Sequence, residues 1–106
     1  MVNPLAGEVA VVLDGVPRVA KLTLGALAEL EAELGAESLL DLVRRFEAGA
    51  FSSRDVLALI VAGLRGGGWE GGARDLLRAE IGGGPVAAAR IAAELLARAF
   101  APPEGG

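Results

Sequence analysis

The sequence predicts an α+β fold that is mostly α, with an N-terminal β-hairpin packed on a bundle of about five short helices. Two observations support this fold class. Two runs near the start, residues 8–13 and 16–22, are rich in β-branched residues and are separated by Asp14-Gly15, a dipeptide favoured by type I′ hairpin turns. The remainder, residues 23–100, consists of apolar stretches with helical spacing between capping residues and glycines. Since an isolated hairpin is marginally stable in water, we expect it to lie on the helices.

Composition limits the possible functions. We expect one domain, 1–106, in which residues 8–22 form the hairpin, 23–100 the helical region and 101–106 a flexible tail. The chain has no Cys and no His, which removes disulfides, thiolate chemistry and the usual proton shuttle at neutral pH. A net charge of −4 opposes nucleic-acid binding. We therefore expect no nucleic-acid partner and no cofactor.

The distribution of apolar residues indicates a soluble chain that has a protein partner. The longest apolar run, residues 56–64, is far shorter than the ~20 residues that span a membrane. Residues 1–4 lack the basic and apolar regions of a signal peptide, so we expect a cytoplasmic location. Counting the 16 glycines with the 53% hydrophobic residues gives about 68%, against about 45–50% in ordinary domains. This excess suggests apolar surface that a partner or a second copy covers.

Within the hairpin, Pro17 places the start of the second strand at an edge or outside the ladder. The first helix is expected at Leu24–Leu34, with Thr23 as N-cap and Gly35 at its end. Ser38 and Asp41 open the second helix, which ends at Gly49. The expected inward faces are Leu24, Leu27, Leu30 and Leu34 in the first helix, and Leu39, Leu42, Val43 and Phe46 in the second.

A central core helix is expected at residues 53–64. Ser52 and Asp55 have the spacing of a capping box, and the apolar residues that follow cover most of the helix circumference, as in a buried helix. Residues 65–72 are expected to form a mobile loop. A short helix at 73–81 should place Leu76, Leu77 and Ile81 inward. The last helix should run from Pro85 to about Phe100, with Ala88, Ile91, Ala92, Leu95, Ala99 and Phe100 on its packing face.

Catalytic and metal-binding candidates are few, and we predict no catalytic, cofactor-binding or metal site. Thr23, Ser38, Ser52 and Ser53 are the only hydroxyl side chains, and each precedes an apolar helical run, so helix capping explains them. Glu29, Glu33 and Glu37 are spaced by four residues and could hold a hard cation such as magnesium. A solvated acidic helix face explains them better, because no convergent ligand set is visible.

The glycine-rich segment after the central helix has two open interpretations. Gly66, Gly68 and Gly71 match G-x-G-x-x-G, but they follow a helix rather than the strand of a βαβ unit, so nucleotide binding is not indicated. The segment is either a hinge that lets the next helix fold back or a flexible loop that presents Trp69 to a partner.

Three long blocks, residues 22–35, 44–68 and 79–100, closely resemble the small gene transfer agent proteins of alphaproteobacteria, and the opening residues 2–15 resemble them too. That family is grouped with phage tail assembly chaperones and is also described as a tail tube protein family. The resemblance implies a non-enzymatic assembly chaperone that binds the helix-rich tape-measure protein during tail morphogenesis. The alternative is a structural tail component, part of a tube or ring, that self-associates in the particle.

Partner contacts are the remaining prediction. We expect Trp69 and the exposed parts of Leu64, Phe51 and Phe100 to touch phage-like tail proteins, above all the tape-measure protein, with a homo-oligomer as a further possibility. A small enzyme or metal-binding protein is the third hypothesis, for which the sequence offers no supporting motif.

Overall fold

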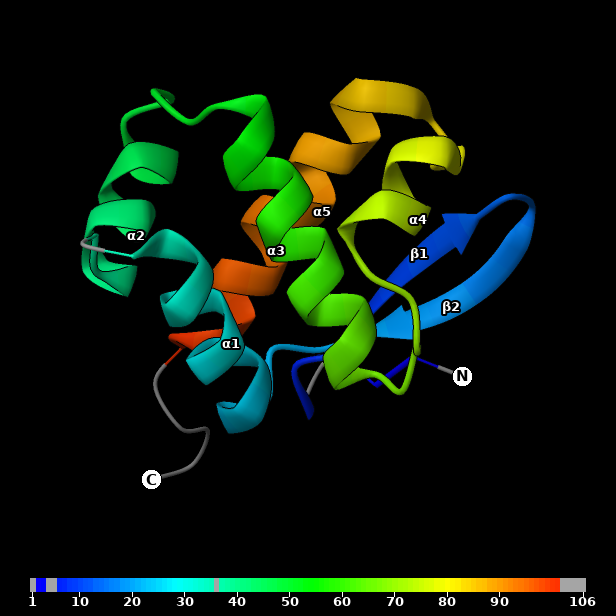
Figure 1. Ribbon diagram of the computed structural model, residues 1–106, viewed down its shortest axis with the longest axis horizontal. Coiled ribbons are helices and arrows are strands. Elements are labelled where there is room, and N and C mark those ends of the chain that lie inside the picture. The colour runs from blue at the N-terminus through cyan, green and yellow to red at the C-terminus, as the bar shows by residue number, and fades with distance from the viewer. Residues whose placement is uncertain (1, 4–5, 36, 102–106) are drawn as a thin grey trace.

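Two antiparallel strands precede five helices along the chain in the computed structural model, which describes residues 2, 3, 6–35 and 37–101. In order they are β1 (Val9–Leu13), β2 (Val16–Ala20), α1 (Leu24–Leu34), α2 (Leu39–Glu47), α3 (Ser53–Gly66), α4 (Ala73–Arg78) and α5 (Gly84–Ala99) (Figure 1). The predicted α+β, mostly α fold class is confirmed. Residues 102–106 of the predicted tail lie outside the described residues.

The hairpin turn forms as predicted at Asp14-Gly15. Both residues have positive φ, 51° and 78°, as a type I′ turn requires. Side chains alternate along β1, so that Val9, Val11 and Leu13 are buried. Pro17 pairs with Val12. Counting from the turn, this pair is a non-hydrogen-bonded one, in which an N–H would point away from β1, so proline removes no ladder bond.

β1 continues its pairing with the segment that follows α4. Leu13 forms an antiparallel bridge with Ile81. The Gly82 N–H donates to the Val12 carbonyl at 2.9 Å, and the Asp14 N–H donates to the Glu80 carbonyl at 2.8 Å. These bonds hold residues 80–82 against β1, and they correct the predicted helix at 73–81. The helix ends at Arg78, because the chain beyond it pairs with a strand.

The buried core is centred on α3, which in Figure 1 crosses in front of α5 with α1 and α2 on one side and the hairpin on the other. The largest fully buried side chains come from five elements: Val11, Leu30, Leu42, Leu59, Ile60, Leu64 and Leu95. Leu59, Ile60 and Leu64 all belong to α3, so the predicted central helix is confirmed. Its circumference is only partly buried, however, because Leu57, Ala58 and Val61 remain partly exposed.

Three helix starts carry the predicted caps. The Thr23 hydroxyl accepts the Ala26 N–H at 3.1 Å. Ser38 and Asp41 form a complete capping box, and so do Ser52 and Asp55. Three of the four hydroxyl side chains of the chain therefore satisfy backbone donors at helix starts, as expected from their positions.

Two leucines predicted to point inward are exposed. Leu24 is 85% exposed, because it is the first residue of α1 and the helix instead turns Ala26 and Leu30 toward the core. Leu77 is 71% exposed on α4, where only Leu76 is buried. In a helix as short as Ala73–Arg78, one inward leucine suffices to attach it to the core.

The end of α3 packs directly on the backbone after β2, which explains part of the glycine cluster. A Cβ atom on Gly66 would lie 2.0 Å from the Lys21 carbonyl oxygen, and one on Gly67 would lie 1.9 Å from that of Val19. The Lys21 N–H also donates to the Gly63 carbonyl at 2.8 Å. The helix therefore continues to Gly66, past the predicted end at residue 64, and glycine is needed there for close approach.

Candidate protein-interaction surface

The four residues predicted to contact a partner occupy different environments. Leu64 is 0% exposed, so the prediction that it offers exposed surface is wrong. Leu64 is buried because of its position on α3. Its neighbour Gly63 packs so closely on Leu95 of α5 and Ala20 of β2 that an added Cβ would lie 2.7 Å from a Leu95 methyl carbon. Leu64 is a core residue.

Phe51 and Phe100 retain partial exposure. Phe51 is half-buried and stacks on Phe46 of α2, with ring centroids 4.5 Å apart and an interplanar angle of 8°. This pair joins the end of α2 to the start of α3. Phe100 caps the C-terminal end of α5 and is 50% exposed. Contact with a partner stays a prediction for both.

Trp69 lies in the connection between α3 and α4 and is half-buried against the core. Its backbone N–H donates to the Leu64 carbonyl at 2.9 Å. Its ring covers Gly71 so closely that a Cβ there would lie 2.2 Å from the indole Cζ2. The indole ring therefore packs on Gly71, while part of it remains accessible to solvent.

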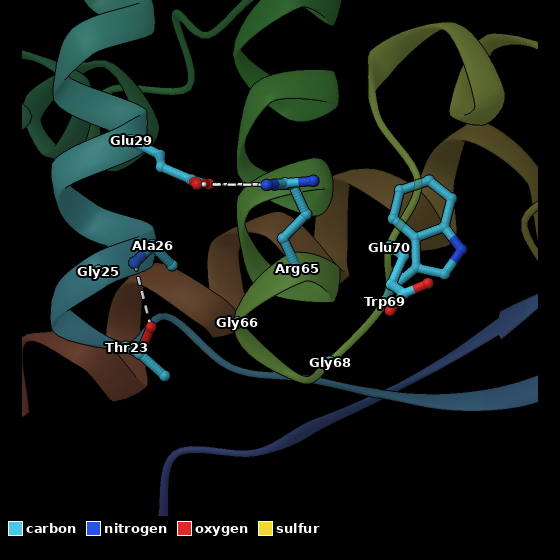
Figure 2. A pocket seen from close by; sticks show the side chains of 9 residues that line it. All are labelled: Thr23, Gly25, Ala26, Glu29, Arg65, Gly66, Gly68, Trp69 and Glu70. Carbon is cyan, nitrogen blue, oxygen red and sulfur yellow. Dashed lines mark hydrogen bonds and ion pairs between the residues drawn. The ribbon is translucent and has the colours of Figure 1, made fainter.

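A surface pocket of about 580 Å³ lies between α1 and the end of α3, beside Trp69 (Figure 2). Figure 2 shows Glu29 and Arg65 pointing toward one another across this pocket, with Trp69 beyond Arg65. The Arg65 Nε donates to Glu29 at 3.1 Å, and the Arg65 guanidinium lowers the pKa of the Glu29 carboxyl. The Thr23 hydroxyl at the same pocket caps α1. Glu29 and Arg65 thus neutralise one another, while Glu70 also lines this pocket.

A second ion-pair group ties α2 to the start of α3. Arg45 donates to both carboxylate oxygens of Asp55, at 3.0 and 2.8 Å, and to Glu37 at 2.5 Å. Asp55 is only 8% exposed and also accepts the Ser52 N–H at 2.9 Å. The hydrogen bonds from Arg45, and secondarily that from the Ser52 N–H, lower the pKa of the Asp55 carboxyl despite its burial. Asp55 therefore both caps α3 and anchors α2.

The acidic side chains and the helices of the described residues bear on metal binding and on membrane insertion. No group of three or more His, Cys, Asp or Glu side chains is arranged there to hold a metal ion. Of the acidic series considered as a cation site, Glu29 and Glu37 are instead paired with arginines. No helix in this part of the chain is long and apolar enough to cross a membrane.

A groove of about 830 Å³ runs along α3 between α1 and the start of α4. Partly exposed apolar side chains from two helices line it: Leu34 of α1, and Leu57, Ala58 and Val61 of α3, whereas Leu30 and Ala62 in the same lining are buried. Glutamates of α1 and arginines of α3 also line it. Sequence reasoning assigned this stripe of α3 to the core. The signal that could have identified the groove is the pair of arginines, Arg54 and Arg65, that bracket the stripe on the same helix face.

Fold and surface together define a small helical protein, with a β-hairpin at its start, whose surface carries a groove lined by apolar and charged side chains. The chain belongs to the family described as phage tail tube protein, GTA-gp10, whose family model matches residues 6–102. The suspected gene transfer agent tail family is thereby confirmed, and the chain is a phage tail-related protein of a gene transfer agent. No curated protein and no solved structure matches the chain.

Proposed function

We propose that this protein is a non-enzymatic assembly chaperone of a phage-like tail, which binds the tape-measure protein in the cytoplasm before the tube forms around it. The observation that favours a chaperone is the partly uncovered apolar stripe of α3 at Leu57, Ala58 and Val61. The family match extends over residues 6–102 and so relates nearly the whole chain to a phage tail. The partners proposed are therefore other tail proteins.

The surface of the molecule supports a binding role. The described residues leave seven large apolar side chains exposed, and the stripe of α3 at Leu57, Ala58 and Val61 is only partly covered. An incompletely covered central helix is a surface on which the apolar face of another protein can be buried. A chaperone needs such a surface for a client that is insoluble alone.

A non-enzymatic role is supported by the engagement of the polar side chains. Thr23, Ser38 and Ser52 cap helices, Glu29 pairs with Arg65, and Glu37 and Asp55 pair with Arg45. A thermal-shift screen against nucleotides and divalent cations tests this point. We expect no change in melting temperature, whereas a clear shift with any one ligand would favour an enzyme or a metal-binding protein.

The alternative is a structural component that self-associates into a ring or tube. The family description favours it, because it names a tail tube protein. Strand addition at the β1 edge would have to displace residues 80–82, which bond to Val12 and Asp14. On the β2 edge, the Lys21 N–H is bonded to Gly63 and the Val19 carbonyl faces Gly67. A ring of this protein would therefore be built through side-chain contacts rather than by strand addition.

Co-expression tests the chaperone proposal. The tape-measure protein would be expressed alone, with this chain, and with an unrelated acidic helical protein of similar size as the control. We expect only this chain to keep the tape-measure protein in the soluble fraction and to co-purify with it. A tape-measure protein that is equally soluble in all three conditions, and does not co-purify, would contradict the proposal.

A further inference from the structure

We propose that the groove along α3, between α1 and the start of α4, is the client-binding site and that its occupant is an amphipathic helix of the tape-measure protein. This inference rests on the proposed chaperone function and adds to it the surface used and the chemistry recognised. The helix would lay an apolar stripe on Leu57, Ala58 and Val61 of α3, with charged side chains that match the unpaired charges around the groove.

The floor of the groove has the spacing that receives a helix. Leu57, Ala58 and Val61 follow one another at i, i+1 and i+4 on α3, and Leu34 of α1, also partly exposed, lies beside them in the lining of the groove. Ridges formed by residues three and four apart pack into the grooves of another helix. The elements that line this surface are helical, so an extended peptide would find no strand edge with which to pair.

The length of the groove can be estimated from α3. Arg54 and Arg65 line its two ends and are eleven residues apart, which corresponds to about 16 Å along the helix axis. Eleven residues also complete about three turns, so both arginines lie on the same face as the apolar stripe between them. The occupant that fits is a helix of about three turns.

Charged side chains of both signs border the groove. Glu29 and Glu33 of α1 and Glu37 just beyond it supply the acidic groups, and Arg54 and Arg65 stand at the two ends of the apolar stripe of α3. Glu29 pairs with Arg65, and Glu37 pairs with Arg45, so the two ends of the acidic border are neutralised. Because Glu29 lies near the end of α3 and Glu37 near its start, α1 and α3 run antiparallel.

Two charges on these borders remain available to a partner. Glu33 and Arg54 are exposed, and neither forms an ion pair within the part of the chain that the structure describes. A docked helix that places a Lys or Arg beside Glu33 and an Asp or Glu beside Arg54 would satisfy both, and would thereby fix its own direction in the groove. The occupant is thus a helix with a basic side chain where it faces Glu33 and an acidic side chain near the end that lies beside Arg54.

Two pairs of variants test the groove. Ala58→Lys places a long charged side chain in the floor, and Ala93→Lys makes the same change on the exposed face of α5 as its control. Glu33→Arg reverses the unpaired border charge, and Glu31→Arg changes net charge equally on the same helix outside the groove. Because Glu33 and Glu31 are both exposed, this second pair remains informative if Ala58→Lys fails to fold.

The binding partners for the measurement are the full-length tape-measure protein and overlapping peptides of it of about 20 residues, long enough to form a helix on binding. Affinity would be measured by calorimetry and helix formation by circular dichroism. We expect one or more peptides to gain helix when bound. Ala58→Lys should weaken binding by at least about tenfold, and Glu33→Arg by about three- to tenfold at low salt, with less than about twofold for each control.

The outcomes separate this inference from the function on which it rests. Binding of the tape-measure protein that Ala58→Lys and Glu33→Arg leave unchanged would overturn the groove assignment while the chaperone function stands. A bound peptide that remains extended would also overturn it. Self-association that Ala58→Lys abolishes would assign the groove to a second copy instead. A wild-type protein that binds neither the tape-measure protein nor any peptide would contradict the chaperone function, and this inference with it.

Discussion

Replacing Gly66 by alanine should loosen the contact between α3 and the chain that leaves β2. The new Cβ would lie 2.0 Å from the Lys21 carbonyl oxygen, so α3 must move by at least about 1 Å to reach an ordinary separation of about 3 Å or more. The same movement would stretch the 2.8 Å hydrogen bond from the Lys21 N–H to the Gly63 carbonyl beyond hydrogen-bonding distance. The substitution therefore disturbs packing and a hydrogen bond together.

The expected cost follows from these two effects. Overpacking costs about 1–3 kcal/mol and a lost hydrogen bond about 0.5–1.5 kcal/mol, while alanine regains about 0.5–1 kcal/mol of helix propensity. The net destabilisation should be about 2–3 kcal/mol, or a fall of about 10–20 °C in melting temperature for a domain of this size. Thermal denaturation followed by circular dichroism measures it directly.

Gly25→Ala is the matched control, because Gly25 also lies in a helix. A Cβ there would meet only the Thr23 hydroxyl, at 3.9 Å. Without a steric cost, the change should be neutral or stabilising by up to about 1 kcal/mol. If Gly66→Ala melts within about 2 °C of Gly25→Ala, the carbonyl contact is not the reason for glycine at the end of α3.

Three further predictions concern other contacts. Because the pKa of Asp55 is lowered in the folded state, its ionised form stabilises the fold above about pH 3.9, and this contribution is lost as the pH falls through the folded-state pKa. Asp55→Asn should therefore lower the free energy of unfolding by about 2 kcal/mol at pH 7, measured by denaturant unfolding. The difference between the variant and the wild type should shrink at acid pH. Asp14→Ala should destabilise the fold by about 1–2 kcal/mol, because it puts alanine at positive φ and removes the carboxylate oxygen that accepts the Glu80 N–H. Asp14→Asn should cost less. Gly71→Ala should displace the indole of Trp69 and shift its fluorescence emission to the red. An unchanged emission spectrum would contradict the packing of the indole ring on Gly71.

Local signals in the sequence predicted the elements well. Asp14-Gly15, Thr23 and the two Ser–Asp capping boxes act within a few residues, so their effects can be predicted without the tertiary structure. They placed the hairpin turn and three helix starts correctly. Where a residue's role depends on what lies beside it in space, the sequence was less informative.

The differences between prediction and structure have that common cause. α4 stops early because residues 80–82 bond to β1, which is distant in the sequence. Leu64 is buried, and Leu57 and Val61 are partly uncovered, because α5 and β2 cover only part of α3. Periodicity shows that a helix is apolar on several faces, but it does not show which face lacks a neighbour. The groove could therefore not be predicted from periodicity, and Arg54 and Arg65 were the sequence signal that could have indicated it.

The glycine cluster shows the same limit in another form. A hinge and a partner-facing loop were the two interpretations open from sequence. The structure adds a third role, because Gly66 and Gly67 allow α3 to approach the Val19 and Lys21 carbonyls, and Gly71 supports the indole of Trp69. A close approach between two backbone segments does not alter the hydrophobic periodicity of the sequence. It depends only on which segments the fold brings together.

The composition of finished particles tests the proposed function most directly. Quantitative mass spectrometry of purified gene transfer agent particles would compare the amount of this chain with that of the tape-measure protein and the major tail subunits. A chaperone that leaves when the tube forms should be absent, or far below one copy per tape-measure protein. Its presence at the stoichiometry of the tail subunits would contradict the chaperone assignment and identify a tube or ring component.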